Sequence, residues 1–219
     1  MTIKENIIDI KKDLPDDVTL ICVSKTKPNE SILEAYESGE RNFGENKVQE
    51  LVAKYEELPK DIKWHLIGHL QTNKVKYIVG KVELIHSLDN IKLLEEIEKR
   101  YKAANEIANT LIQINIGNEE SKTGIDLKEL EMLIEEVERC QNVKVKGLMA
   151  IVPMGTYDEC RGYFKEMKNI FEVLKNKKFK NLKMEILSMG MSGDYKLAIE
   201  EGSTMVRVGQ GIFGSRNYL

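Results

Sequence analysis

The chain has few cysteines and lacks any long hydrophobic run. Its three cysteines, Cys22, Cys140 and Cys160, are widely spaced and form no C-x-x-C pair, so they fit neither a disulfide framework nor a zinc site. No apolar stretch approaches the length of a membrane span, and the first residues, MTIKE, are charged where a signal peptide would lead into an apolar block. We therefore expect a cytoplasmic protein with reduced thiols and no membrane partner.

Neither positive nor negative side chains are in large excess. The 219 residues include 33 lysines and arginines and 36 aspartates and glutamates, and the two signs are interleaved along the chain. A chain with this pattern has no basic face for tracking a nucleic-acid backbone, so no nucleic-acid partner is expected. No linker rich in proline, glycine or serine interrupts the sequence. With 42% hydrophobic residues the chain can bury one substantial core, and we predict a single domain over residues 1–219.

Short β-branched runs alternate with helical patterns throughout the chain. This alternation is typical of βα units around a parallel sheet, and eight units predict an α/β fold with a single (β/α)8 TIM-like barrel. An extra helix is expected before the first strand, because Ile3, Ile7, Ile8 and Ile10 lie at helical spacing. The predicted strands are Thr19–Lys25, Arg41–Gly44, Trp64–Gly68, Glu83–Leu88, Thr110–Ile116, Val143–Ile151, Met184–Gly190 and Met205–Gly211.

Two of the predicted helices carry recognisable start signals. Asp126 followed by Glu129, and Thr156 followed by Glu159, both fit a capping box, in which side chains accept hydrogen bonds from N–H groups that the new helix leaves unpaired. Apolar stripes follow Asp126 and Asn90 at helical spacing. These stripes are expected to face the barrel.

Lys25 ends the first predicted strand, which is where the chemistry of such barrels gathers. It shares the two-residue period of Ile21 and Val23, so all three side chains are expected to point into the barrel. Burial favours the neutral amine, which is the form that attacks an aldehyde to give a Schiff base. The alternative is a lysine that reaches solvent or pairs with a carboxylate at the strand end.

Two glycine-rich segments follow the last two predicted strands, and together they suggest a phosphate-binding cup. They are SMGMSGD, residues 188–194, and VRVGQG, residues 206–211. Glycine lets backbone N–H groups approach an anion closely, and Ser192 can add a hydroxyl. Phosphate sites built from the loops after strands seven and eight recur in this fold. The alternative is that the glycines only permit tight turns.

Two further motifs are set aside. GQGIFG, residues 209–214, matches the G-x-G-x-x-G fingerprint of dinucleotide-binding proteins, but the helix, strand and acidic residue that should follow have no room before Leu219. His65 and His69 are spaced as a zinc pair might be, yet no third ligand is evident and Gly68 interrupts them. We therefore expect no metal site and a supporting role for His65.

Several segments together closely resemble the pyridoxal phosphate homeostasis protein family, in order along nearly the whole chain. They are VSKTKP (23–28), FGEN (43–46), WHLIG (64–68), GLM (147–149), SMGMS (188–192) and GSTMVRVG (202–209). The resemblance implies a barrel of the alanine racemase N-terminal type, with pyridoxal 5′-phosphate (PLP) held as an aldimine, a Schiff base, on Lys25. It also implies the other cofactor-binding residues, which are Asn46, His65, Ser192, Arg207, Gly209 and Gln210.

The resemblance also implies a role for several of these residues. Ser192 and the backbone of Gly209 and Gln210 would hold the phosphate, and Arg207 would face the pyridine nitrogen. The chain departs from the family at Gly193, where an acidic residue is common, and this puts the detail of the phosphate loop in doubt.

A carrier is favoured over an enzyme. PLP enzymes that use the ring as an electron sink place a carboxylate against the pyridine nitrogen, whereas Arg207 can only donate to that nitrogen and leaves it unprotonated. Alanine racemase takes a second acid/base from the C-terminal domain of a partner subunit, and the sequence stops after the eighth predicted strand. We therefore predict a monomeric PLP-homeostasis protein that binds PLP and releases it to apo-PLP enzymes during transient contacts.

Two alternatives stay open. The first is an amino-acid racemase or decarboxylase that uses an unrecognised base such as His65. The second is a class I aldolase-like enzyme, in which Lys25 forms a Schiff base directly with a sugar phosphate. Colour separates the second alternative from a PLP carrier, because a PLP Schiff base is yellow and an aldolase lysine is colourless.

Overall fold

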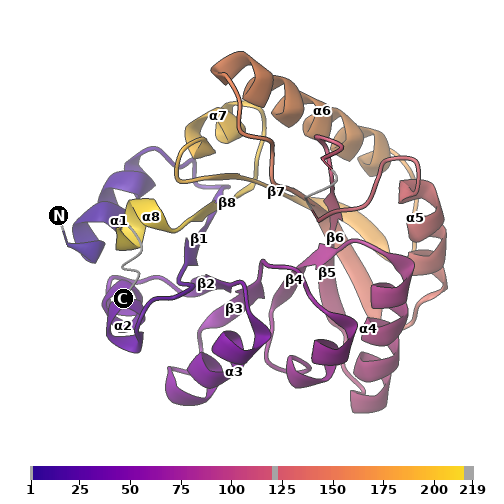
Figure 1. Cartoon of the computed structure of the whole chain (residues 1–219), viewed down its shortest axis with the longest axis horizontal. Coiled ribbons are helices and arrows are strands. Elements are labelled where there is room, and N and C mark those ends of the chain that lie inside the picture. The colour runs from indigo at the N-terminus through magenta and orange to yellow at the C-terminus, as the bar shows by residue number, and fades with distance from the viewer. Residues whose placement is uncertain (1, 120–122, 215–219) are drawn as a thin grey trace.

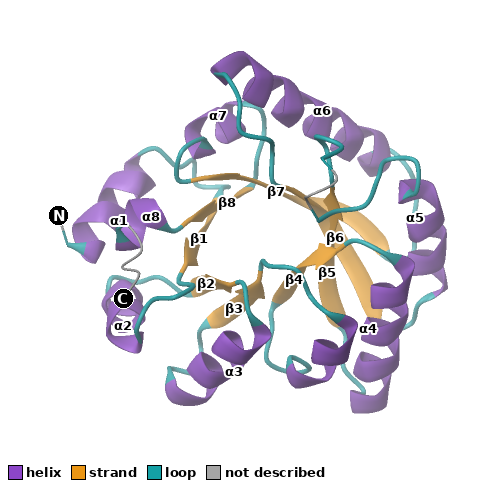
Figure 2. Cartoon of the chain, viewed as in Figure 1, coloured by secondary structure: helices purple, strands orange, loops and turns teal. Residues whose placement is uncertain are grey.

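Eight parallel strands form a closed barrel, and the helices are arranged around its outside (Figures 1 and 2). The computed structural model describes residues 2–119 and 123–214. Neighbouring strands pair in chain order, and β8 closes the barrel by pairing with β1. The predicted (β/α)8 barrel is thereby confirmed. The strands are β1 (Thr19–Val23), β2 (Asn42–Glu45), β3 (Lys63–Leu66), β4 (Leu84–Leu88), β5 (Ala108–Ile114), β6 (Val143–Ala150), β7 (Leu182–Met191) and β8 (Met205–Val208).

The helices that follow Thr2, Asn90 and Thr156 begin where the side chains of these residues accept hydrogen bonds from N–H groups of the first turn. Thr156 Oγ1 accepts a hydrogen bond from the N–H of Glu159, and Glu159 Oε2 accepts one from the N–H of Thr156 at 2.7 Å, which confirms the capping box predicted there. The helices are α1 (Ile3–Lys12), α2 (Asn29–Glu37), α3 (Val48–Glu57), the 3-10 helix η1 (Thr72–Tyr77), α4 (Ile91–Ala104), α5 (Leu130–Arg139), α6 (Tyr157–Lys175), α7 (Tyr195–Glu200) and α8 (Gln210–Phe213).

The capping box predicted at Asp126 is wrong. Asp126 Oδ1 accepts a 2.9 Å hydrogen bond from the N–H of Lys128, so this side chain closes a turn instead of starting a helix. Helix α5 begins at Leu130, and Glu129 at its N-cap makes no capping bond with its side chain. The apolar stripe is nevertheless buried from Leu130 onward, through Leu133, Ile134 and Val137.

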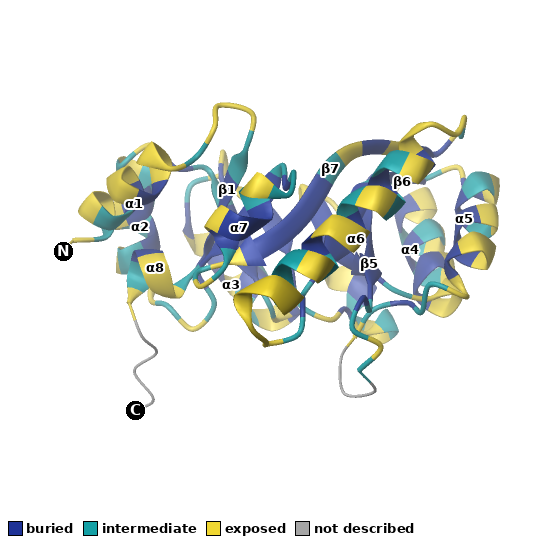
Figure 3. Ribbon diagram, turned by 90° about the horizontal axis from the view of Figure 1, so that it is seen from above, coloured by how far each residue is buried: buried dark blue, intermediate teal, exposed yellow. Residues whose placement is uncertain are grey.

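The core has two parts, separated by the barrel wall. The larger part lies between the strands and the surrounding helices, and Figure 3 shows buried strands inside helices whose outer faces are exposed. The smaller part fills the barrel interior. Successive residues of β1 belong to different parts, since Ile21 lies inside while Leu20 and Cys22 pack outward. The interior part consists of Ile21, Leu84, Leu111, Met149 and Met205.

The predicted N-terminal helix is confirmed as α1, and it packs against α8 (Figure 1). Ile7 and Ile10 are buried, whereas Ile8 is exposed on the outer face. The side-chain amide of Asn6 donates a 2.8 Å hydrogen bond to the carbonyl of Ile212 in α8. Two helices that lie far apart in the sequence are therefore joined beside β1.

Gly147 sits where β6 passes β7 too closely for a side chain. Its φ is +152°, and a Cβ added there would lie 1.8 Å from the carbonyl oxygen of Ile186. We expect Gly147→Ala to lower the free energy of unfolding by at least about 3 kcal/mol, because backbone atoms must move to admit the methyl group.

Gly162 provides the matched control. It lies in the middle of α6, and a Cβ added there would meet nothing within 4 Å. Gly162→Ala should therefore raise the free energy of unfolding by about 0.5–1 kcal/mol. Urea titration of the wild type and of both variants measures the two changes. Equal effects of the two substitutions would contradict the close approach of the two strands.

Candidate functional site

A pocket of about 470 Å³ opens at the carboxyl end of the barrel. Its walls come from the ends of most strands and from the loops that follow them, so residues far apart in the sequence meet there. Six predicted site residues line it: Lys25, Asn46, Ser192, Arg207, Gly209 and Gln210. The other lining residues are Val23, Ile67, Gly68, His69, Gln113, Thr123, Ile151, Met191 and Gly193.

Lys25 reaches the pocket from the turn that follows β1. The strand ends at Val23, two residues earlier than predicted, yet the alternation of sides continues into the turn. Ile21 fills the barrel interior, and Val23 and Lys25 line the pocket, as the two-residue period predicted. The next residue, Thr26, has a φ of 64°, which is uncommon for residues other than glycine and needs support from its surroundings.

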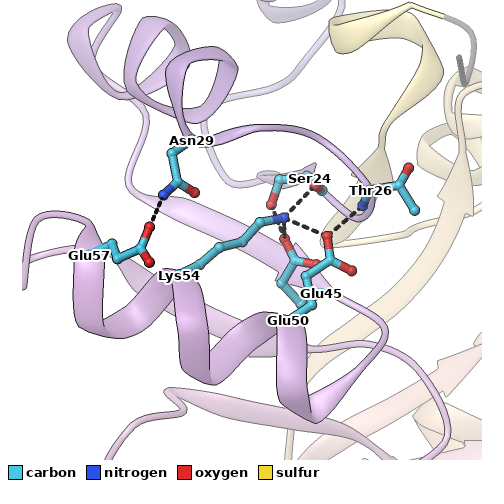
Figure 4. A network of polar contacts seen from close by, with 7 residues as sticks. All are labelled: Ser24, Thr26, Asn29, Glu45, Glu50, Lys54 and Glu57. Carbon is cyan, nitrogen blue, oxygen red and sulfur yellow. Dashed lines mark hydrogen bonds and ion pairs between the residues drawn. The ribbon is translucent and has the colours of Figure 1, made fainter. Parts of the chain in front are cut away.

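A group of charged and polar residues supports this turn (Figure 4). Ser24 Oγ donates a hydrogen bond to Glu45 Oε1 at 2.6 Å, and Lys54 Nζ donates to the same oxygen at 2.8 Å and to the Ser24 carbonyl at 2.9 Å. Glu50 Oε1 accepts from Lys54 Nζ at 2.7 Å and from the N–H of Thr26 at 2.6 Å. We call these five residues the Lys54 cluster. They bind both neighbours of Lys25 and so fix its backbone.

Glu45 is the buried carboxylate of the Lys54 cluster. Burial raises the pKa of Glu45 to about 6, although the Lys54 ammonium and the Ser24 hydroxyl both act in the opposite direction. The second oxygen, Oε2, is buried and has no hydrogen-bond partner among the described residues. Protonation of Glu45 is therefore easier in the folded protein than in the unfolded chain.

The glycine-rich loops after β7 and β8 meet at Ser192. Its Oγ accepts hydrogen bonds from the backbone N–H groups of Gly209 and Gly211, both at 3.2 Å. Asp194 Oδ1 accepts from the N–H of Met191 at 2.6 Å and holds the first loop in shape. Two backbone donors and a hydroxyl thus converge at one edge of the pocket, which is an arrangement that suits an anion.

Arg207 lies in the wall of the pocket and is only 4% exposed. Its Nη1 donates to Ser188 Oγ at 2.7 Å and its Nη2 to the carbonyl of Ala150 at 2.9 Å. Burial lowers the pKa of Arg207 to about 10, so the guanidinium stays positively charged at neutral pH. Within the described chain, no carboxylate forms an ion pair with it. Both groups that accept from it, a side-chain hydroxyl and a backbone carbonyl, are neutral, and the positive charge is available to a ligand.

His65 is the predicted site residue that the structure does not bring to this pocket. Its ring lies inside the barrel, where Nδ1 is 3.0 Å from His86 Nε2 and Nε2 is 3.2 Å from Asn42 Oδ1. Burial lowers the pKa of His65 to about 3. The ring is therefore neutral at physiological pH, and it opens on a second cavity, of about 270 Å³, that also touches Asn42, Lys63 and Met205.

Three polar residues of the pocket were missed by the sequence analysis as site residues. Gln113 interrupts the apolar run of β5, and its Nε2 donates to the carbonyl and the hydroxyl of Thr123, both at 3.0 Å. His69 lies at the pocket rim with Nδ1 3.6 Å from Asp89 Oδ2. The amide of Gln113 inside an otherwise apolar strand was a usable signal, because buried polar side chains need a reason to be there.

Among residues 2–119 and 123–214, no three histidine, cysteine, aspartate or glutamate side chains come together to hold a metal ion. No helix in the same ranges is long and apolar enough to cross a membrane.

The closed barrel, the lysine after β1 and the glycine-rich loops after β7 and β8 define a barrel of the alanine racemase N-terminal class. The family described as "Alanine racemase, N-terminal domain" matches residues 1–217. Alanine racemase from Streptomyces coelicolor A3(2) superposes with a TM-score of 0.78 at 17% identity, over 98% of this chain and 58% of that one. At this identity the similarity shows the shared fold alone.

More similar proteins identify the family. A pyridoxal phosphate homeostasis protein from Aquifex aeolicus is 46% identical over 201 residues, which are 91% of this chain and 87% of that protein. PipY from Synechococcus elongatus PCC7942, solved with PLP bound, has a TM-score of 0.90 and 36% identity, over 97% of this chain and 100% of PipY. The chain belongs to the pyridoxal phosphate homeostasis protein family. The resemblance seen in the sequence is thereby confirmed.

The raised pKa of Glu45 predicts a pH-dependent stability. The folded protein binds this proton more tightly than the unfolded chain, so the stabilisation is complete below about pH 4.5 and is lost as the pH rises through about 6. Relative to Glu45→Gln, the wild-type free energy of unfolding should fall across this window by on the order of 2 kcal/mol.

Urea unfolding at several pH values tests this prediction. Glu135→Gln, on the exposed side of α5, serves as the control and should follow the wild-type pH profile. Parallel profiles for wild type and Glu45→Gln would show that Glu45 has an ordinary pKa in the fold.

Proposed function

We propose that this chain binds PLP in the pocket at the carboxyl end of the barrel and serves in PLP homeostasis. The observation that carries the proposal is the meeting of a lysine, a buried arginine and two converging backbone donors in one pocket. PLP has three groups that match them, namely an aldehyde, a pyridine nitrogen and a phosphate. The PLP-bound structure of PipY, 36% identical to this chain, supports the same ligand here.

Lys25 is the proposed covalent anchor. Its neutral Nζ adds to the aldehyde carbon of PLP, a C=N bond forms, and the aldehyde oxygen leaves as water. An incoming amine can take the place of Nζ at the same carbon, which restores the free lysine, and the bond is therefore reversible. The Lys54 cluster supports this role because it fixes the backbone on both sides of Lys25.

The other predicted site residues that line the pocket have three roles in this proposal. Ser192 and the backbone N–H groups near Gly209 and Gln210 would bind the phosphate, since they form the convergent donors of the pocket. Arg207 would donate to the pyridine nitrogen, which then stays unprotonated because a guanidinium has no proton acceptor. Asn46 lines the same pocket and would contact the cofactor from the loop after β2.

We propose a carrier rather than an amino-acid enzyme. An unprotonated pyridine ring is a weaker electron sink, so Arg207 does not favour carbanion chemistry. His65 would have to supply a base in the racemase or decarboxylase alternative, but burial lowers its pKa to about 3, which makes it a poor proton acceptor, and it does not line the pocket. We expect the carrier to work as a cytoplasmic monomer that hands PLP to apo-PLP enzymes, because one chain supplies both Lys25 and the phosphate-binding loops.

Lys25→Ala should abolish covalent PLP binding while leaving the fold intact. We expect the yellow colour and the Schiff-base absorbance of the purified protein to be lost, and borohydride reduction to give no pyridoxyl-lysine. Lys27→Ala is the matched control. Lys27 Nζ donates to the carbonyl of Phe213 at 2.9 Å, away from the lining of the pocket, so PLP should still bind. A pyridoxyl group mapped to Lys27 would contradict the assignment, and a colourless wild-type protein would favour the aldolase alternative.

PLP-loaded protein should reactivate an apo-PLP enzyme without turning over amino acids itself. The reversible bond to Lys25 allows release, and the pocket offers little acid/base assistance to a reaction at an amino acid. Reactivation is followed by the activity of the acceptor enzyme. In parallel, alanine, serine, glutamate, ornithine and lysine are incubated with the loaded protein, and optical rotation and carbon dioxide are measured. Turnover that disappears in Lys25→Ala would replace the carrier by an enzyme.

A further inference from the structure

A chain of polar contacts runs through the barrel interior from Arg207 toward the opposite end. Arg207 Nη1 lies 2.7 Å from Ser188 Oγ, and Ser188 Oγ lies 3.3 Å from His86 Nδ1. His86 Nε2 lies 3.0 Å from His65 Nδ1, and His65 Nε2 lies 3.2 Å from Asn42 Oδ1. Ser188 and His86 are fully buried, and His65 is 3% exposed. We call these five residues the interior relay.

Hydrogen-bond chemistry gives the interior relay a single direction. A guanidinium only donates, so Ser188 Oγ accepts from Arg207. Among the described residues, His86 Nδ1 is then the remaining partner that can accept the proton of this buried hydroxyl. His86 Nδ1 is then an acceptor and its proton is on Nε2, which donates to His65 Nδ1. By the same rule His65 carries its proton on Nε2 and donates to Asn42 Oδ1. Every acceptor therefore faces toward Arg207 and every donor faces away.

Neither histidine adds a charge to the interior. Burial lowers the pKa of His86 well below its ordinary value and that of His65 to about 3, and the nearby guanidinium acts on His86 in the same direction. The relay therefore presents the neutral oxygen of Ser188 to Arg207. A carboxylate in the same position would cancel the charge of the guanidinium. Arg207 is held in place and keeps its full positive charge for a ligand in the pocket.

We propose that Ser188, His86 and His65 are positioning residues for Arg207. Their hydrogen bonds all run in one direction, and they keep the Ser188 oxygen oriented as an acceptor for Arg207, which holds the guanidinium in one plane. None of the three residues touches the ligand. This inference rests on the proposed function, because it makes PLP affinity depend on residues that are absent from the lining of the pocket. It also assigns one tautomer, with the proton on Nε2, to both buried histidines.

The tautomers are tested in the PLP-free protein by ¹⁵N NMR of labelled histidine. We expect His65 and His86 to show Nδ1 as the unprotonated nitrogen and Nε2 as the protonated one. His69 is half exposed at the pocket rim and serves as the internal reference. A proton on Nδ1 of either buried ring, or a mixture of tautomers, would overturn the proposal. This readout needs no cofactor, so it judges the relay even if the wild-type protein fails to bind PLP.

The positioning role is tested with Ser188→Ala. Arg207 loses the acceptor for Nη1, and we expect PLP to bind the PLP-free protein roughly tenfold more weakly, the loss of one hydrogen bond to a charged group. The Schiff-base absorbance should also shift, because the guanidinium moves relative to the ring. The NMR signals of His86 should at the same time lose their single-tautomer pattern.

Ser203→Ala is the matched control. Ser203 is also buried, but within residues 2–119 and 123–214 its hydroxyl has only backbone carbonyls in hydrogen-bonding distance, those of Leu187, Met189 and Met205. This variant should lose stability and keep wild-type PLP affinity, absorbance and histidine tautomers. Equal PLP affinity and absorbance in Ser188→Ala and wild type would overturn the positioning role.

Asn42→Leu keeps the test decisive if Ser188→Ala does not fold. Asn42 is partly exposed at the far end of the relay, and the substitution removes the acceptor for His65 Nε2. We expect His65 and His86 to keep the proton on Nε2, because the direction of the relay is set from Arg207, and PLP affinity to fall by a smaller factor than in Ser188→Ala. A proton that moves to Nδ1 of either ring in Asn42→Leu would show that Asn42, and not Arg207, sets the proton positions, and would overturn the proposal.

Discussion

Arg207 keeps a positive charge inside the barrel wall, although burial lowers its pKa to about 10. A buried cation is stable only where surrounding dipoles are aimed at it, and here they are the Ser188 hydroxyl and the Ala150 carbonyl. Ser188 belongs to β7 and Ala150 to β6, while Arg207 belongs to β8. The charge that faces the pocket therefore depends on the register of three adjacent strands. Closure of the barrel pairs β8 with β1, so the same charge lies on the strand next to the turn that carries Lys25.

The features that follow from local rules could be predicted from the sequence. The side on which Lys25 emerges needs only the alternation along β1, and the donors near Ser192 need only glycines at the ends of two strands. The place of His65 could not be found in this way. Alternation puts its ring inside the barrel, but its depth along the barrel axis depends on how the strands are staggered, and that is a property of the closed sheet. The start of α5 was wrong because an aspartate before a helix can equally close a turn.

The Lys54 cluster could not be predicted from the sequence either, because its members come from three separate places: the turn after β1, the end of β2, and α3. Two unfavourable features accompany it: burial raises the pKa of Glu45 to about 6, and Thr26 has a positive φ of 64°. The covalent role that we propose for Lys25 requires the lysine to return to the same position after each release, and a turn that is held on both sides provides this. We interpret the Lys54 cluster as the means by which the fold keeps the amine of Lys25 at a constant position relative to the glycine-rich loops of the pocket.

The contact between α1 and α8 has a consequence for how the protein is made. Synthesis on the ribosome proceeds from the first residue to the last, so α1 emerges some two hundred residues before the Ile212 carbonyl that accepts from Asn6. The N–H groups of Gly209 and Gly211 belong to the same late segment. A nascent chain can therefore expose Lys25 long before any phosphate-binding loop exists beside it. Under the proposed function, selective capture of a phosphorylated aldehyde by Lys25 would begin only when the final strand closes the barrel.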